Sequence, residues 1–115
     1  MKDIMNEIEY KGKKYKIVFN LNVMDLIQDK YETVQKWGEL TDGSKGEPNI
    51  KALKYGFTCM LNEGIEIDNE NNGTDEKLLT ESQVGRIISE IGLEGVANKL
   101  SDTVVSSTQS AEKNA

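Results

Sequence analysis

Residues 8–37 read IEYKGKKYKIVFNLNVMDLIQDKYETVQKW, and this stretch decides the fold. Apolar and polar residues alternate on both sides of Gly12, which is the pattern of two short strands joined by a turn. Gly12 suits the turn because it has no Cβ to penalise a positive φ. The return strand places alternate residues on one face: Tyr15, Ile17 and Phe19. Because a hairpin alone is marginal in water, we expect the helices that follow to cover it.

The second part of this stretch predicts one long amphipathic helix. Asn20 or Asn22 can cap its start, and Gly38 can end it. Its apolar positions are Val23, Met24, Leu26, Ile27, Tyr31, Val34 and Trp37. At about 100° per residue they span an arc of roughly 160°, which is wide for a helix that covers one surface. We therefore expect it to contact both the hairpin and a second helix.

Further helices are predicted downstream. Pro48 fits the first turn of one, in which Gly56 predicts a close approach by a neighbouring helix. Residues 63–77 are acidic and polar, and we expect a loop there. Thr80 and Gln83 form a capping box that starts another helix. A final helix is expected from the apolar spacing of residues 93–104.

These elements predict an α+β fold that is mostly helical, with an N-terminal β-hairpin packed on a small bundle of about four helices. A chain of 115 residues is long enough for one modest core. We expect residues 1–105 to form a single globular domain. Residues 106–115 show no apolar period, so we expect them to form a disordered polar tail.

Composition excludes several classes of function. The chain carries 20 acidic and 14 basic residues, a net charge of −6, and such a surface repels phosphate backbones. It has no histidine and one cysteine, so we expect no catalytic residues, no metal site, no cofactor and no disulfide. No apolar run reaches the roughly 20 residues that span a bilayer. We expect a non-enzymatic protein of the cytoplasm that binds neither nucleic acid nor membrane.

Two motifs resemble functional sites but have simpler interpretations. Residues 68–73, DNENNG, resemble the start of a calcium loop, but Leu79 stands where the bidentate glutamate belongs, which favours a solvated acidic loop. Residues 80–100 have the outline of a helix-turn-helix, but the second helix offers Glu94 and Asp102 where a DNA reader needs basic side chains. A helical hairpin that completes the core is the better interpretation.

A protein without catalytic groups is expected to act by contact. The candidate partner-binding residues are Met24, Trp37, Tyr55 and Cys59. Large amphipathic side chains are enriched in binding sites, and Trp37 lies at the end of its predicted helix beside a loop. Trp37 can either pack internally or lie exposed on a partner-binding surface, and exposure predicts that Trp37→Ala weakens partner binding and leaves the fold intact.

The order of elements resembles the tail assembly chaperones of long-tailed bacteriophages and their prophages. The segments that carry the likeness are IEYKGKKYKIVFNLNVMDLIQDKY, then IKALKYGFTCMLNEG, then LLTESQVGRIISEIG, and the likeness as a whole spans residues 8–105. Members of this family have no invariant signature, so the likeness is one of overall pattern.

The resemblance implies a chaperone that binds the apolar, helical tape-measure protein, keeps it soluble and helps to recruit tail-tube subunits around it. It also implies a location in the cytoplasm of the bacterial host and absence from the mature virion. Self-association is left open. The alternative is a small phage or host regulator that uses the last two helices on DNA or on a protein.

Overall fold

The computed structural model describes residues 6–42 and 46–113, with side chains described as far as Val104. Two strands open the fold: β1 (Asn6–Tyr10) and β2 (Lys13–Ile17) pair antiparallel. Lys11 and Gly12 form the turn between them, both at positive φ. The predicted hairpin is confirmed, although its second strand ends before Phe19.

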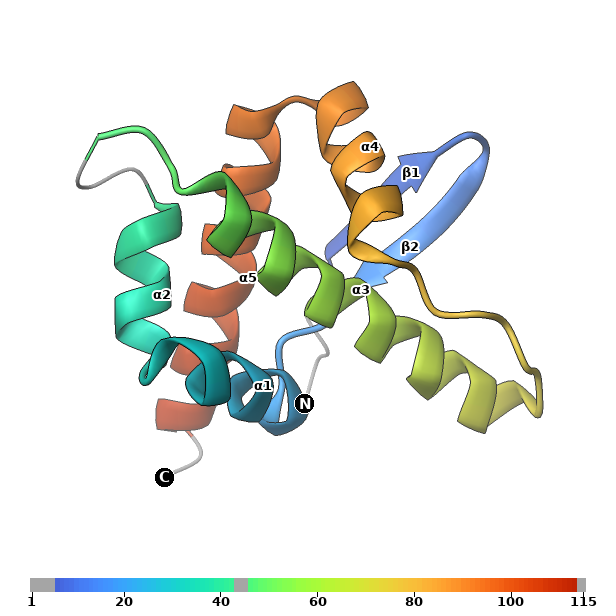
Figure 1. The fold of residues 1–115 in the computed structure, drawn as a ribbon. Coiled ribbons are helices and arrows are strands. Elements are labelled where there is room, and N and C mark those ends of the chain that lie inside the picture. Colours follow the sequence, from blue (N-terminus) through green and yellow to red (C-terminus); the bar gives the residue numbers. More distant parts are fainter. Residues whose placement is uncertain (1–5, 43–45, 114–115) are drawn as a thin grey trace.

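Five helices follow within the described residues: α1 (Leu21–Tyr31), α2 (Val34–Thr41), α3 (Ile50–Asn72), α4 (Glu81–Ile91) and α5 (Leu93–Lys113). Helix α3 crosses the middle of the molecule (Figure 1). Helices α1 and α2 lie toward one side of it, while the hairpin and α4 lie toward the other. This arrangement confirms the α+β, mostly helical class, with a hairpin packed on a small helical bundle.

The single long helix expected up to Trp37 is wrong. The chain breaks at Glu32, whose φ of 73° ends α1, and the hydroxyl of Thr33 accepts the Lys36 backbone N–H at 3.0 Å to cap α2. The break turns both segments toward the core, so that Ile27 of α1 and Trp37 of α2 are both buried. The break explains the wide apolar arc, because two short helices with different directions can bury apolar residues that would lie on different sides of one straight helix.

The loop expected over residues 63–77 is also wrong for most of its length. Helix α3 continues to Asn72 and ends at Gly73, which adopts the left-handed conformation with φ 65°. The acidic residues lie on the exposed side of this helix and bind neighbours. The Asp68 carboxylate accepts the Lys16 ammonium at 2.8 Å, and the Glu63 carboxylate accepts the Asn20 amide at 2.7 Å. These contacts tie the second half of α3 to β2 and to the start of α1.

The hairpin lies against α3 at a close approach of the two backbones. A Cβ placed on Gly64 of α3 would lie 2.9 Å from the Lys16 carbonyl oxygen of β2. The Val18 N–H reaches the Met60 carbonyl oxygen at 3.4 Å. Ile8 and Ile17 of the hairpin thereby join the buried apolar cluster that α3 centres. The expected cover for the hairpin is therefore supplied mainly by α3.

The close approach predicted at Gly56 is present, and its partner is the Trp37 indole of α2. Trp37 is 2% exposed, and its Nε1 donates to the Ala52 carbonyl oxygen at 2.8 Å. A Cβ on Gly56 would lie 2.6 Å from the indole Cε2, well inside van der Waals contact. The exposed alternative for Trp37 is therefore wrong, because α3 receives the indole where it has no side chain.

Helix α5 begins directly after Gly92, which ends α4 at φ 105°. It buries Val96 and Leu100 in the core and continues to Lys113, across residues for which the sequence predicts a disordered tail. Residues 114 and 115 lie outside the described part. Among the described helices, none combines the length with the apolar content that crossing a bilayer requires.

Gly56→Ala should destabilise the protein by about 2 kcal/mol, because overpacking of the Trp37 indole outweighs the roughly 1 kcal/mol by which alanine favours a helix. Urea unfolding measures the difference. Gly38→Ala in α2 is the matched control, since its Cβ would meet nothing within 4 Å, and it should leave stability equal or slightly higher. Equal stability of Gly56→Ala and the unmodified protein would contradict the packing described here.

Candidate functional site

A groove of about 210 Å³ lies between α1, α3 and the segment that leads into α4; we call it the α1–α3 groove. Its lining residues are Leu26, Tyr55, Thr58, Cys59, Asn62, Glu63, Glu66, Leu78 and Glu81. Leu26 and Leu78 are each 46% exposed, which is unusual for leucines that border one hollow. The groove thus offers apolar surface to a partner.

Tyr55 joins the two helices that form the groove. Its hydroxyl donates to the Leu26 carbonyl oxygen of α1 at 3.1 Å, and its ring meets that of Tyr31 edge to face with centroids 5.9 Å apart. The Lys30 ammonium lies 4.3 Å from the centroid of the Tyr55 ring. Contacts on three sides hold the phenol in place, so one wall of the groove is rigid before any partner arrives.

The opposite wall is an extended segment, residues 74–80, that two asparagines of α3 hold in place. The Asn62 side chain accepts the Leu79 N–H at 2.7 Å and donates to the Leu79 carbonyl oxygen at 3.0 Å. Asn69 does the same for the backbone of Glu76, with both distances at 3.0 Å. Fixing the backbone at Leu79 leaves the neighbouring Leu78 side chain exposed at the edge of the groove.

The charged residues that line the groove are all acidic: Glu63, Glu66 and Glu81. Glu63 is held by amide donors from the start of α1, at 2.7 Å from Asn20 and 3.1 Å from Asn22. The Lys30 ammonium lies over the Tyr55 ring, but Lys30 is not among the residues that line the groove. An apolar floor with an acidic rim favours an apolar segment that carries lysine or arginine at its margins.

The four predicted contact residues do not form one surface. Tyr55 and Cys59 line the α1–α3 groove, Tyr55 partly buried and Cys59 9% exposed. Met24 is partly buried against the core and is not among the groove residues. Trp37 is in the core, so Trp37→Ala should damage the fold instead of leaving it intact, at a cost of about 3–5 kcal/mol.

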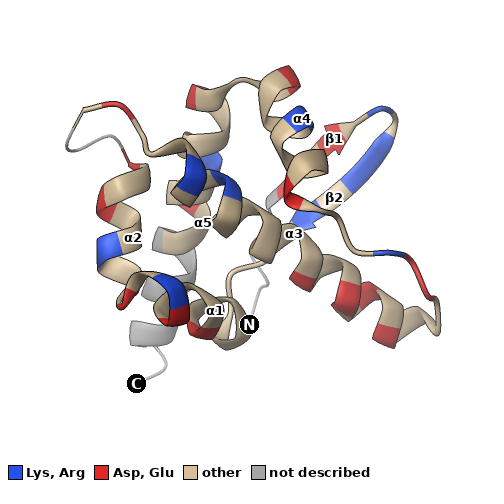
Figure 2. Cartoon of the chain, viewed as in Figure 1, with Lys and Arg blue, Asp and Glu red and all other residues tan. Residues whose placement is uncertain are grey.

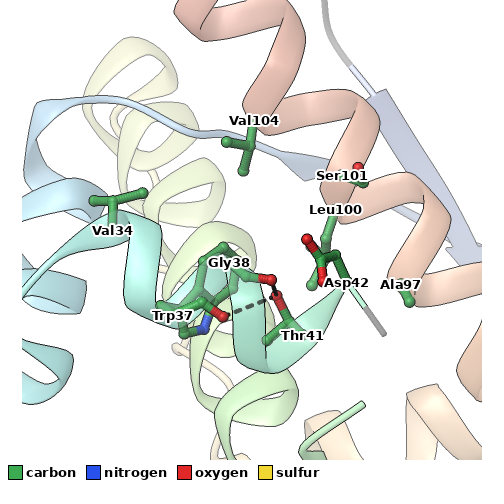
Figure 3. A pocket seen from close by; sticks show the side chains of 9 residues that line it. All are labelled: Val34, Trp37, Gly38, Thr41, Asp42, Ala97, Leu100, Ser101 and Val104. Atoms are coloured by element: carbon green, nitrogen blue, oxygen red, sulfur yellow. Dashed lines mark hydrogen bonds between the residues drawn. The ribbon is translucent and has the colours of Figure 1, made fainter. Parts of the chain in front are cut away.

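Trp37 instead borders a smaller pocket of about 130 Å³ between α2 and α5 (Figure 3). Val34, Gly38 and Thr41 line it from α2, and Leu100 and Val104 from α5. The Thr41 hydroxyl donates to the Trp37 carbonyl oxygen at 3.1 Å, which satisfies a buried polar group inside α2. This pocket separates two packed helices, and its edges offer less exposed apolar surface than the α1–α3 groove.

The DNENNG segment lies in the last turn of α3 and its cap, where Asn69 bonds to backbone groups and Asp68 pairs with Lys16. Asp68 and Asn69 are thus engaged in holding neighbouring segments. Within the described residues, no group of three or more histidine, cysteine, aspartate or glutamate side chains is arranged to hold a metal ion.

Leu26 and Leu78 were not among the residues expected to bind a partner. Leu26 lies in the apolar arc of its helix, so the sequence pattern assigns it to the core. Leu78 follows an acidic stretch whose path is fixed by hydrogen bonds from the side chains of Asn62 and Asn69. Because these bonds join residues that are well separated in the sequence, no short sequence pattern predicts them. Their exposure is visible only once α1 and α3 are placed.

Burial raises the pKa of the Tyr55 phenol to about 12 and also raises the pKa of the Cys59 thiol. A raised pKa means that the folded state holds the proton more tightly than the unfolded chain, in which the phenol ionises near 10.0. The stability that the neutral phenol contributes should be complete below pH 10 and should be lost as pH rises through about 12.

Ultraviolet titration of tyrosinate checks this expectation. The folded protein should show a step near pH 12 that is absent in Tyr55→Phe. If all four tyrosines of the unmodified protein ionise in a single step near pH 10, and Tyr55→Phe only lowers the amplitude of that step, the burial of this ring is contradicted.

Comparison of the chain with protein-family models, with curated proteins and with solved structures gives no match in any of the three.

Proposed function

We propose that this protein is a tail assembly chaperone of a long-tailed phage or prophage, and that it holds an apolar helical segment of the tape-measure protein in the α1–α3 groove. The observation that carries the proposal is the pair of half-exposed leucines, Leu26 and Leu78, at the edges of a groove with a rigid aromatic wall. In this role the protein is non-catalytic and works in the cytoplasm of the host.

The geometry suits a helix-in-groove mode of binding. An amphipathic helix that enters a groove buries residues at spacings of three and four, and its backbone needs no partner because its hydrogen bonds are internal. A long helix with an apolar face aggregates when that face is exposed to water, and a partner that covers the face prevents the aggregation. Tyr55 supplies a fixed aromatic surface of the kind that anchors such contacts.

The resemblance described from the sequence supports the same role. Its three segments correspond to the hairpin with α1, to the first two thirds of α3, and to α4 with the segment before it. Each of the three segments supplies a residue that lines the α1–α3 groove: the first supplies Leu26, the second Tyr55 and the third Leu78. Recruitment of tail-tube subunits and absence from the virion belong to the proposal through the resemblance alone.

Co-expression with tape-measure fragments from the same tail gene cluster tests the proposal. The protein should keep an apolar helical fragment in the soluble fraction and co-purify with it. The double variant Leu26→Ser/Leu78→Ser should lose most of this co-purification, because it removes the apolar edges of the groove. Circular dichroism should show that its helix content is unchanged, since both side chains are half exposed.

Leu21→Ser is the matched control. Leu21 is also a leucine of α1 and is 79% exposed, but it does not line the groove. It should retain the fragment as well as the unmodified protein does. If no fragment co-purifies with the unmodified protein, the chaperone assignment is wrong; if Leu21→Ser loses the fragment equally, the groove is not the site.

A further inference from the structure

A second groove lies on a different side of α3, between its first turns and α4; we call it the α3–α4 groove. It is open and has a volume of about 650 Å³. Its apolar residues are Ile50, which is 61% exposed, together with Ile88 and Leu93. Ile50 is among the most exposed large apolar residues of the described chain, second to Leu21.

The groove is open because the edge of α4 that borders it carries small residues, while Val84 and Ile87 of the same helix pack into the core. Ser82, Gly85 and Ser89 share this edge at spacings of three and four. Opposite them, the Lys54 side chain lies across Gly85, its Cδ 3.4 Å from where a Cβ would stand. Short side chains here leave room above the helix backbone for another element to pack.

The charge of this groove is opposite to that of the molecule. The chain has a net charge of −6, yet both charged residues that line the groove are cations, Lys54 of α3 and Arg86 of α4. Arg86 is the single arginine of the sequence. Neither side chain forms an ion pair with the described residues. In Figure 2 blue patches mark the first half of α3 and one blue patch marks α4, while the red positions of α4 lie toward its ends.

The acidic residues of α4 form no ion pair with these two cations in the described part of the chain. Glu90 follows Arg86 by one helical turn, and Glu81 lies at the start of the helix. The Arg86 guanidinium can hold a carboxylate through two parallel hydrogen bonds, and the Lys54 ammonium can hold a second one. The groove thus combines an apolar strip with two cations ready for carboxylates.

We propose that the α3–α4 groove binds an acidic amphipathic helix of a protein partner, with its apolar face on Ile50, Ile88 and Leu93 and its carboxylates on Lys54 and Arg86. The inference does not rest on the chaperone role. It assigns the molecule two grooves of opposite charge on different faces of α3, so that a basic apolar segment and an acidic one are directed to different sites.

A pair of matched peptides tests the proposal. Each has about 18 residues, or five helical turns, with leucines at helical spacing. The flanking positions are glutamate in one peptide and lysine in the other. Each is titrated into the full-length protein labelled with ¹⁵N, up to about 1 mM, which half-saturates a site with a Kd of about 1 mM.

The glutamate peptide should shift the amide signals of Ile50, Gly85 and Arg86, and the lysine peptide should leave them in place. Lys54→Gln/Arg86→Gln should weaken binding of the glutamate peptide by about tenfold or more, because it removes both charge-assisted contacts. Lys11→Gln/Lys77→Gln makes the same change of net charge at two exposed lysines outside the groove, and it should leave the affinity within about twofold.

Three results would overturn the proposal. The first is that the glutamate peptide leaves the groove signals unchanged at about 1 mM. The second is that both double variants weaken binding of this peptide equally, which indicates attraction by net charge alone. The third is that sedimentation shows a concentration-dependent dimer that Lys54→Gln/Arg86→Gln abolishes, which assigns the groove to a second copy of this chain. Retention of the tape-measure fragment should be unaffected by Lys54→Gln/Arg86→Gln, so the two proposals fail independently.

Discussion

The contact of the Trp37 indole with α3 is the interaction on which the rest of the structure depends. The indole lies over Gly56, donates to the Ala52 carbonyl oxygen and is shielded from water. To reach this position the chain must leave α1 at Glu32 and start α2 at Thr33. That break fixes how α1 lies beside α3, and hence where Leu26 and Tyr55 meet. The α1–α3 groove is therefore a consequence of a core contact made at Gly56, the residue next to Tyr55 on α3.

The local elements of the fold could be predicted from the sequence. The Gly12 turn and the Thr80–Gln83 capping box each rest on a few adjacent residues, and both are present. The break at Glu32 could not be predicted in this way, because no local sequence signal marks a non-glycine residue at positive φ, and the burial of Trp37 that accompanies the break depends on α3, which comes later in the chain. The continuation of α3 through its acidic half was missed because Lys16, which pairs with Asp68, comes from a distant strand.

The candidate site was predicted in part. Tyr55 and Cys59 lie on the side of α3 that faces away from its main apolar stripe, and that position was readable as a contact surface. Leu26 and Leu78 were not, since a leucine in an apolar pattern is normally buried. The basic groove was missed for a different reason: Lys54 and Arg86 are far apart in sequence, and only the packing of α4 on α3 brings them to one hollow.

The two grooves carry charges of opposite sign at their margins, which the net charge of the chain alone does not indicate. Around the α1–α3 groove, glutamates surround apolar surface, whereas around the α3–α4 groove, lysine and arginine do so. Charges at the margin of an interface act mainly on partner choice and on the rate of encounter, while the apolar surface supplies most of the affinity. We infer that partner choice in this protein is made at these margins.

Methyl NMR of the complex with a tape-measure fragment tests the central claim most directly. With the leucine and valine methyl groups labelled in this protein alone, intermolecular contacts should connect the fragment to Leu26 and Leu78, and not to Leu21 or Leu100. Contacts confined to Leu100 and Val104, in the pocket between α2 and α5, would contradict the account and move the binding site to the other side of the core.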